Sequence, residues 1–131
     1  MNQISMTINN ESDLVTARLK GRDVAKDLGF GVFDQTLIST AISELARNIL
    51  EYAGTGTIEV ESTPDAPQKG VRVRAIDKGP GIEDLEAAQR EGYSTSGSLG
   101  VGLSGVQRLM DEFSIESEPA RGTTVEVLKW L

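Results

Sequence analysis

The sequence contains no cysteine and no histidine, and the two absences exclude several kinds of chemistry. Without histidine the chain cannot use Ser-His-Asp or Cys-His catalysis, ligate zinc through imidazole, or phosphorylate a histidine of its own. Without cysteine there is no disulfide or redox argument to make. Carboxylates, amides, hydroxyls and glycines are therefore what remains for a functional site.

Basic side chains are also scarce, since 13 Lys and Arg stand against 20 Asp and Glu, a net charge of −7. This deficit disfavours nucleic acid as a partner, and a bound phosphate would need a metal ion, backbone N–H groups or a few well-placed bases. No run approaches the ~18 apolar residues of a membrane span, and the first residues resemble neither a secretory signal nor a transit peptide. We expect a soluble, cytoplasmic protein without a membrane partner, forming one domain over residues 1–131.

The first half of the sequence predicts a strand, two helices and a hairpin. QISMTI at 3–8 is typical of a strand, and Asn10 is a candidate N-cap for a helix over about 11–28. A second helix over about 34–52 has the strongest apolar period in the chain, with Ile38, Ala41, Ile42, Leu45, Ile49 and Tyr52 on one stripe. The stretches 57–63 and 71–77 are rich in β-forming residues, and the polar segment 64–70 between them predicts a hairpin.

The second half predicts a short helix at 83–92, a mobile loop at 93–102 and a helix from Leu103 whose apolar face extends to Phe113. The chain then closes with a second hairpin, formed by 114–118 and 123–131. Because strands come in pairs rather than alternating strictly with helices, we expect an α+β fold: a two-layer sandwich whose mainly antiparallel sheet carries helices on one face.

Glycines are concentrated between Gly79 and Gly105, which hold seven of the chain's 14. Glycine lets backbone approach a ligand, and successive N–H groups in such loops can bind anions, whereas a plain surface loop explains the cluster poorly. Residues 100–105 match GxGxxG, but no apolar strand precedes them and only 26 residues follow, which excludes a dinucleotide-binding βαβ unit. What remains is a glycine-rich approach to a helix N-terminus, a place that favours phosphate.

Three polar side chains are candidates for binding or catalysis. Asp77 ends an apolar strand, where its carboxylate could accept a hydrogen bond from the exocyclic amine of adenine, although an Asp-Gly turn is the simpler reading of this residue alone. Glu44 and Asn48 lie four residues apart, so they point within about 40° of each other on one helix. The pair suits phosphoryl transfer, because the carboxylate can deprotonate a hydroxyl and the neighbouring amide oxygen can ligate Mg²⁺. The plainer interpretation is that both residues lie on the solvated side of an amphipathic helix. The role of Arg47 stays open.

Four segments together resemble the ATP-binding boxes of the GHKL superfamily, in order and in spacing: SELARN at 43–48, DKGPGI at 77–82, SGSLGVGLSG at 96–105 and GTT at 122–124. That superfamily includes the ATPase domains of gyrase and Hsp90, histidine kinases and bacterial anti-sigma serine kinases. Residues 91–113 and the terminal LKWL are similar to the RsbT-like serine kinases of the stressosome, so the resemblance covers nearly the whole chain. It implies the Bergerat fold of these ATPases.

The resemblance also implies roles for individual residues. Glu44 would be the base toward a protein hydroxyl, and Asn48 would bind Mg²⁺ with the nucleotide. Asp77 would read adenine. The remaining nucleotide contacts would come from Gly79, Gly81 and Ile82 beside adenine, from Gly100, Val101, Gly102 and Leu103 at the phosphates, and from Thr123 or Thr124 near adenine. Ser104 stands where the family pattern has proline.

For function, the resemblance implies an ATP- and Mg²⁺-dependent serine/threonine protein kinase. Its acceptors would be STAS-domain proteins (RsbS-like and RsbR-like), and the kinase released from them would activate a PP2C-type phosphatase (RsbU-like) in a sigma-factor stress response. Two alternatives stay open: an ATP-binding anti-sigma factor kinase that sequesters a sigma factor, and a module that senses ATP without transferring phosphate.

Overall fold

The computed structural model describes residues 3–63, 69–79, 102–118 and 122–131 of the chain. Its elements follow the order β1 (Gln3–Ile8), α1 (Glu11–Asp27), α2 (Val32–Tyr52), β2 (Gly56–Ser62), β3 (Gly70–Asp77), α4 (Gly102–Leu109), β4 (Glu112–Glu118) and β5 (Gly122–Trp130). The predicted short helix at 83–92 lies outside the described residues, as does the predicted loop at 93–102 apart from Gly102, which begins α4.

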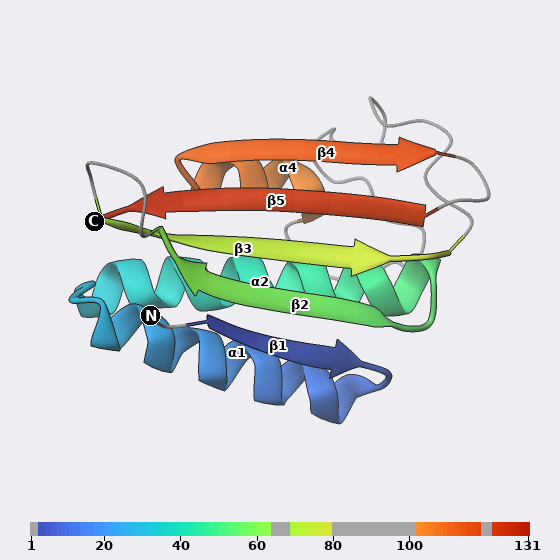
Figure 1. The fold of residues 1–131 in the computed structure, drawn as a ribbon, viewed down its shortest axis with the longest axis horizontal. Coiled ribbons are helices and arrows are strands. Elements are labelled where there is room, and N and C mark those ends of the chain that lie inside the picture. Colours follow the sequence, from blue (N-terminus) through green and yellow to red (C-terminus); the bar gives the residue numbers. More distant parts are fainter. Residues whose placement is uncertain (1–2, 64–68, 80–101, 119–121) are drawn as a thin grey trace.

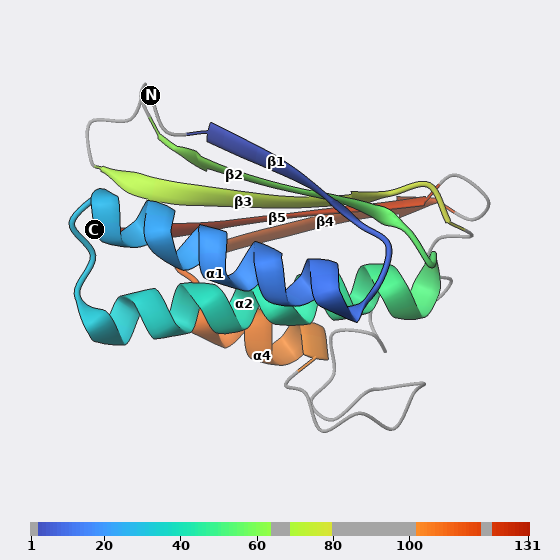
Figure 2. The same cartoon turned by 90° about the horizontal axis from the view of Figure 1, so that it is seen from below.

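The strands form one five-stranded sheet in the order β1-β2-β3-β5-β4, and every neighbouring pair is antiparallel. Figure 1 shows this order, and Figure 2 shows the three labelled helices gathered on one face of the sheet. The two-layer α/β sandwich expected from the sequence is confirmed. None of the helices in the described part of the chain has the length and apolar character that a membrane span requires.

Local sequence explains both long helices. The side chain of Asn10 accepts a hydrogen bond from the backbone N of Asp13 at 2.9 Å, so it caps α1 as its residue type predicts. Helix α2 begins at Val32, two residues before the expected position, after Gly31 as N-cap. Its apolar stripe packs against the sheet and contributes fully buried side chains to the core.

The structure corrects the predicted end of the third helix. The sequence analysis placed Phe113 on the apolar face of the helix that starts near Leu103, but α4 ends at Leu109 and Phe113 lies in β4. From Glu112 onward exposed residues alternate with half-buried ones, the period of a strand, and the pairing of β4 with β5 outweighs the helical spacing of the preceding apolar residues.

The face of the sheet opposite the helices carries a network of charged side chains. Arg74 lies 2.8 Å from Glu126 and 3.5 Å from Glu59, while Arg72 lies 2.9 Å from Glu61 and 3.5 Å from Glu126. The hydrogen bond to Glu126 raises the pKa of Arg74 above its usual value, and desolvation opposes the shift only in part. Because these groups are about a third exposed, the network contributes modestly to stability and mainly keeps this face polar.

Candidate functional site

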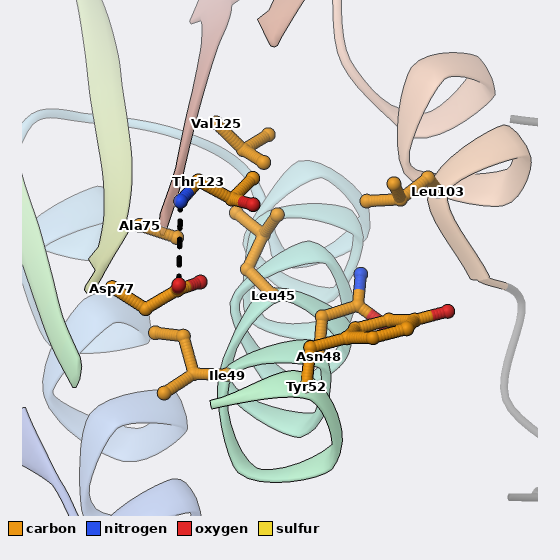
Figure 3. Close-up of a pocket in the computed structure, with 9 residues that line it drawn as sticks. All are labelled: Leu45, Asn48, Ile49, Tyr52, Ala75, Asp77, Leu103, Thr123 and Val125. Carbon is orange, nitrogen blue, oxygen red and sulfur yellow. Dashed lines mark hydrogen bonds between the residues drawn. The ribbon is translucent and has the colours of Figure 1, made fainter. Parts of the chain in front are cut away.

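A pocket lies between the helix layer and one end of the sheet, where α2, α4, β3 and β5 meet (Figure 3). Its lining residues are Leu45, Asn48, Ile49 and Tyr52 of α2, Ala75 and Asp77 of β3, Leu103 of α4, and Thr123 and Val125 of β5. On the sheet side of the pocket, the strand register brings the lining residues together, since Asp77 is paired with Thr123 and Ala75 with Val125. The pocket therefore has a mainly apolar wall with three polar side chains and the hydroxyl-bearing ring of Tyr52, a composition typical of small-molecule sites.

Asp77 is fixed at the end of β3 by two backbone donors. Its Oδ1 accepts hydrogen bonds from Gly79 N at 3.0 Å and from Thr123 N at 3.3 Å. Figure 3 shows the carboxylate at the pocket wall, with the bond to Thr123 drawn. Among the described residues Oδ2 has no hydrogen-bond partner, so it is available to a donor of a ligand.

Two glycines allow the backbone to close around Asp77. Gly122 has φ +106°, and a Cβ there would lie 2.1 Å from the carbonyl oxygen of Asp77. At Gly79 a Cβ would lie 2.5 Å from the Cβ of Ala53, just beyond the end of α2. Any larger residue at either position would push apart the segments that hold the carboxylate.

The two threonines after Gly122 lie on opposite faces of β5. Thr123 is buried, lines the pocket, and exchanges a side-chain hydrogen bond of 2.8 Å with Ser117. Thr124 is the next residue along the strand, so its side chain points to the face that carries Arg74 and Glu126. Of the two candidates, the structure brings Thr123 alone to the pocket.

Glu44 lies beside the pocket and is only 7% exposed. Its Oε2 accepts a hydrogen bond from Gly102 N at 3.3 Å, and its Oε1 lies 3.7 Å from Nε of Arg47. A buried carboxylate is costly unless it is hydrogen-bonded or paired, and these two contacts meet that need. The carboxylate is thereby oriented by its own helix and by the first turn of α4.

Asn48 lies one turn beyond Glu44 and lines the pocket. Its Nδ2 is buried without a hydrogen-bond partner. Rotating the side-chain amide exchanges its oxygen and nitrogen, so either atom can face a ligand. A buried amide without a partner is rare in folded proteins, and a site that binds a polar group explains it.

The predicted site residues thus divide into groups. Asn48, Asp77, Leu103 and Thr123 line one pocket, with Glu44, Gly79 and Gly102 next to it. Thr124 lies on the other face of the sheet, and Gly81, Ile82, Gly100 and Val101 lie outside the described residues.

Sequence reasoning missed most of the apolar wall. Leu45, Ile49 and Tyr52 were assigned to the core because they follow the helical stripe of α2, and Ala75 and Val125 follow the strand alternation in the same way. Spacing identifies an inward-facing residue but does not say whether side chains or a ligand fill the space beyond it. One residue type did indicate a pocket, since Tyr52 carries a hydroxyl that a fully packed core does not need.

Several known proteins resemble this chain in sequence over most of its length. Residues 33–131 match the family model described as "Histidine kinase-, DNA gyrase B-, and HSP90-like ATPase". The chain is 54% identical over 129 residues to the serine/threonine-protein kinase RsbT of Bacillus subtilis, covering 98% of this chain and 97% of that protein. It is 32% identical to an anti-sigma F factor of Caldanaerobacter subterraneus, covering 72% and 68% of the two chains.

Solved structures support the fold. The catalytic domain of the histidine kinase ThkA superposes with a TM-score of 0.58 at 18% identity, covering 99% of this chain and 96% of that one. The SiaB-SiaC complex of Pseudomonas aeruginosa contains a chain that superposes with a TM-score of 0.57 at 12% identity, covering 100% and 90%. At these identities the likeness concerns the fold alone.

Proposed function

Since the chain belongs to the family of histidine kinase-, DNA gyrase B- and HSP90-like ATPases and is a serine/threonine protein kinase, we propose its substrates, its reaction and its partners. Its proposed substrates are ATP and serine or threonine hydroxyls of STAS-domain proteins. Released from them, it would activate a PP2C-type phosphatase. Because the reaction would draw on cytoplasmic ATP, we propose the cytoplasm as its place of action.

The observation that carries the proposed nucleotide site is the arrangement of Asp77 in an apolar pocket. Two backbone N–H groups donate hydrogen bonds to its Oδ1, which leaves Oδ2 to accept a hydrogen bond from the exocyclic amine of adenine. The apolar wall of the pocket would contact the adenine ring. A charged acceptor in such surroundings is selective, because a base that cannot donate there leaves the carboxylate without its partner. Thr123 would bind near adenine beside it.

Magnesium fits the residues at the phosphate end of the pocket. No group of three or more acidic residues able to hold a metal occurs among the described residues, so Mg²⁺ would depend on the nucleotide's phosphates and water, with Asn48 as its protein ligand. Bound there, Mg²⁺ would neutralise the phosphate charge that a chain of net charge −7 cannot. Backbone N–H groups of residues 100–102 would supply further phosphate contacts.

Glu44 is the proposed general base. Its carboxylate would accept the proton of the acceptor hydroxyl as that oxygen bonds to the γ-phosphorus and the bond from the γ-phosphorus to the bridging oxygen breaks, releasing ADP. The contact to Gly102 would hold the carboxylate until nucleotide binds, and the contact to Arg47 would keep it in position for the acceptor. Arg47 would therefore orient the base rather than touch the reacting atoms.

A transfer assay tests the proposal directly. The chain is incubated with γ-labelled ATP, Mg²⁺ and a STAS-domain protein of the same organism, and phosphoserine and phosphothreonine are measured in the acceptor. We expect label in the acceptor and none when Mg²⁺ is chelated. No phosphorylated hydroxyl at any protein concentration would favour a module that senses ATP without transferring phosphate.

An anti-sigma kinase is the second candidate, supported by the likeness to anti-sigma F factors. It would hold a sigma factor in addition to phosphorylating a STAS-domain antagonist. Capture experiments distinguish the two, because our proposal requires a PP2C-type phosphatase among the bound proteins, whereas capture of a sigma factor would favour the second candidate.

A further inference from the structure

Buried side-chain donors without a partner gather where α2 meets α4. In the part of the chain that the structure describes, the buried side-chain atoms that lack a hydrogen-bond partner are Nε of Arg47, Nδ2 of Asn48, Nε of Arg72 and Oγ of Ser104. Arg72 belongs to the charged network on the open face of the sheet. The other three lie on α2 beside Glu44 or in the first turn of α4, and these two helices pack against each other. Buried polar atoms without partners are rare and unfavourable, so their concentration at one junction needs an explanation.

Two of these three residues have a role in the proposed site. Nε of Arg47 lies 3.7 Å from Oε1 of Glu44, so an ion pair offsets part of the cost of its burial. Asn48 lines the pocket and is the proposed protein ligand of Mg²⁺. Ser104 has no such role, although it is only 7% exposed and its hydroxyl has no hydrogen-bond partner in the protein. Its hydroxyl is therefore the donor that remains to be explained.

The buried serines of α2 show what Ser104 lacks. Ser39 and Ser43 are 6% and 8% exposed, and the hydroxyl of each donates a hydrogen bond of 3.0 Å to a carbonyl oxygen of its own helix. Such bonds reach the carbonyl three or four residues earlier in the helix. Ser104 is the third residue of α4, so the positions three and four residues before it precede the helix. A partner for its hydroxyl has to come from elsewhere.

The hydroxyl of Ser104 leans toward the N-terminal end of α4. In a helix the bond from Cα to Cβ tilts toward the N-terminus, and in the first turn the backbone N–H groups at that end have no partner within the helix. These N–H groups and the helix dipole favour an anion. One of them, the N–H of Gly102, donates a hydrogen bond of 3.3 Å to Oε2 of Glu44. An anionic oxygen thus already lies at the end of α4 toward which Ser104 leans.

We propose that the hydroxyl of Ser104 donates a hydrogen bond to the γ-phosphate of bound ATP. The inference rests on the proposed kinase function, in which Glu44 is the base. A base acts within hydrogen-bond reach of the attacking hydroxyl, so the γ-phosphate lies beside Glu44 and hence at the start of α4. The buried hydroxyl then gains its partner when the nucleotide binds. Ser104 stands where the family pattern has proline, so this contact is a property of the present chain rather than of the ligands that the family shares.

Substituting Ser104→Ala tests the contact, with Ser39→Ala as the matched control. The affinities for ATP and for ADP are measured by calorimetry with Mg²⁺ and without acceptor protein, and urea denaturation is measured without nucleotide. We expect S104A to weaken ATP binding about 10- to 100-fold, the range for a hydrogen bond to a charged group, and to leave ADP binding within about twofold of the wild type. Because S104A removes a hydroxyl that has no partner in the protein, its urea midpoint should not fall. S39A should keep both affinities.

The outcomes separate this contact from the kinase function. Unchanged ATP affinity in S104A would refute the contact and assign the hydroxyl to a buried water. Equal losses for ATP and ADP would also refute it, since ADP has no γ-phosphate, and a lower urea midpoint for S104A than for S39A would assign the hydroxyl to the fold. If the wild type binds ATP with the expected difference from S104A but phosphorylates no STAS-domain protein, the contact stands and the kinase proposal fails. A wild type that binds no ATP would refute both.

Discussion

Gly102, the first residue of α4, donates its backbone N–H to Oε2 of Glu44 at 3.3 Å and so joins two residues that are 58 positions apart. A single N–H donates one strong hydrogen bond at a time. In the proposed site a phosphate oxygen at Gly102 N would therefore compete with Glu44 for this donor. Nucleotide binding would then free Oε2 to face the acceptor hydroxyl.

Replacing Glu44 by glutamine tests its role as the base. The amide keeps the size of the side chain and can still accept from Gly102 N, but it cannot take up a proton. We expect phosphate transfer to fall by roughly 10²- to 10⁴-fold, the range for a lost general base, with ATP affinity within about twofold of the wild type. Glu51→Gln on the same helix is the control and should transfer normally. An equal loss of nucleotide binding in E44Q would argue that the carboxylate serves the site's structure.

Asp77→Asn probes the adenine contact. The amide oxygen can accept the hydrogen bonds from Gly79 N and Thr123 N in place of Oδ1, but the NH₂ group cannot accept a hydrogen bond from the exocyclic amine of adenine. We expect ATP binding to weaken by about 1.5 to 3 kcal/mol, the value of a hydrogen bond to a charged group, as measured by calorimetry. GTP should lose less, because guanine presents an acceptor at that edge. Unchanged ATP affinity would remove Asp77 from the base-binding wall.

The neighbouring threonines provide a matched pair. Thr123→Val removes the hydroxyl at the pocket and should weaken ATP binding by about 0.5 to 1.5 kcal/mol, the usual worth of a neutral hydrogen bond. Thr124→Val makes the same chemical change on the opposite face of β5 and should leave affinity unaltered. The reverse pattern would mean that the nucleotide does not occupy this pocket.

Gly122→Ala should destabilise the fold by about 2 to 4 kcal/mol, because the new methyl group meets the carbonyl of Asp77 and alanine disfavours a φ of +106°. Gly54→Ala separates the two effects: φ is +81° there, but nothing lies within 4 Å of the added Cβ. Its cost should be about 1 kcal/mol. Urea denaturation of both variants measures the difference, and equal losses would show that the contact with Asp77 is easily relieved.

Local signals in the sequence predicted most of the fold. The cap of α1 at Asn10 and the two hairpins were predicted correctly, because caps and hairpins depend on residues that are close in the chain. Phe113 was misplaced because apolar spacing at 103, 106, 109, 110 and 113 continues a helical face, whereas pairing with β5 is a long-range effect that spacing does not reveal.

The candidate site was predicted less completely. Asn48 and Asp77 were found through residue type and position, and both line the pocket. The bond between Glu44 and Gly102 could not be foreseen, since it depends on how α4 packs against α2. Choosing Thr123 over Thr124 needed the strand register, and the apolar wall needed the shape of the space it borders.

Helix α2 fixes the spacing of the site residues that it carries. Glu44 and Asn48 lie on one uninterrupted helix of 21 residues, so their spacing and relative direction are set by the helical repeat. One residue inserted between them would turn one side chain by about 100° relative to the other and lengthen the gap by about 1.5 Å. An insertion before Val32 or beyond Tyr52 would leave this geometry unchanged.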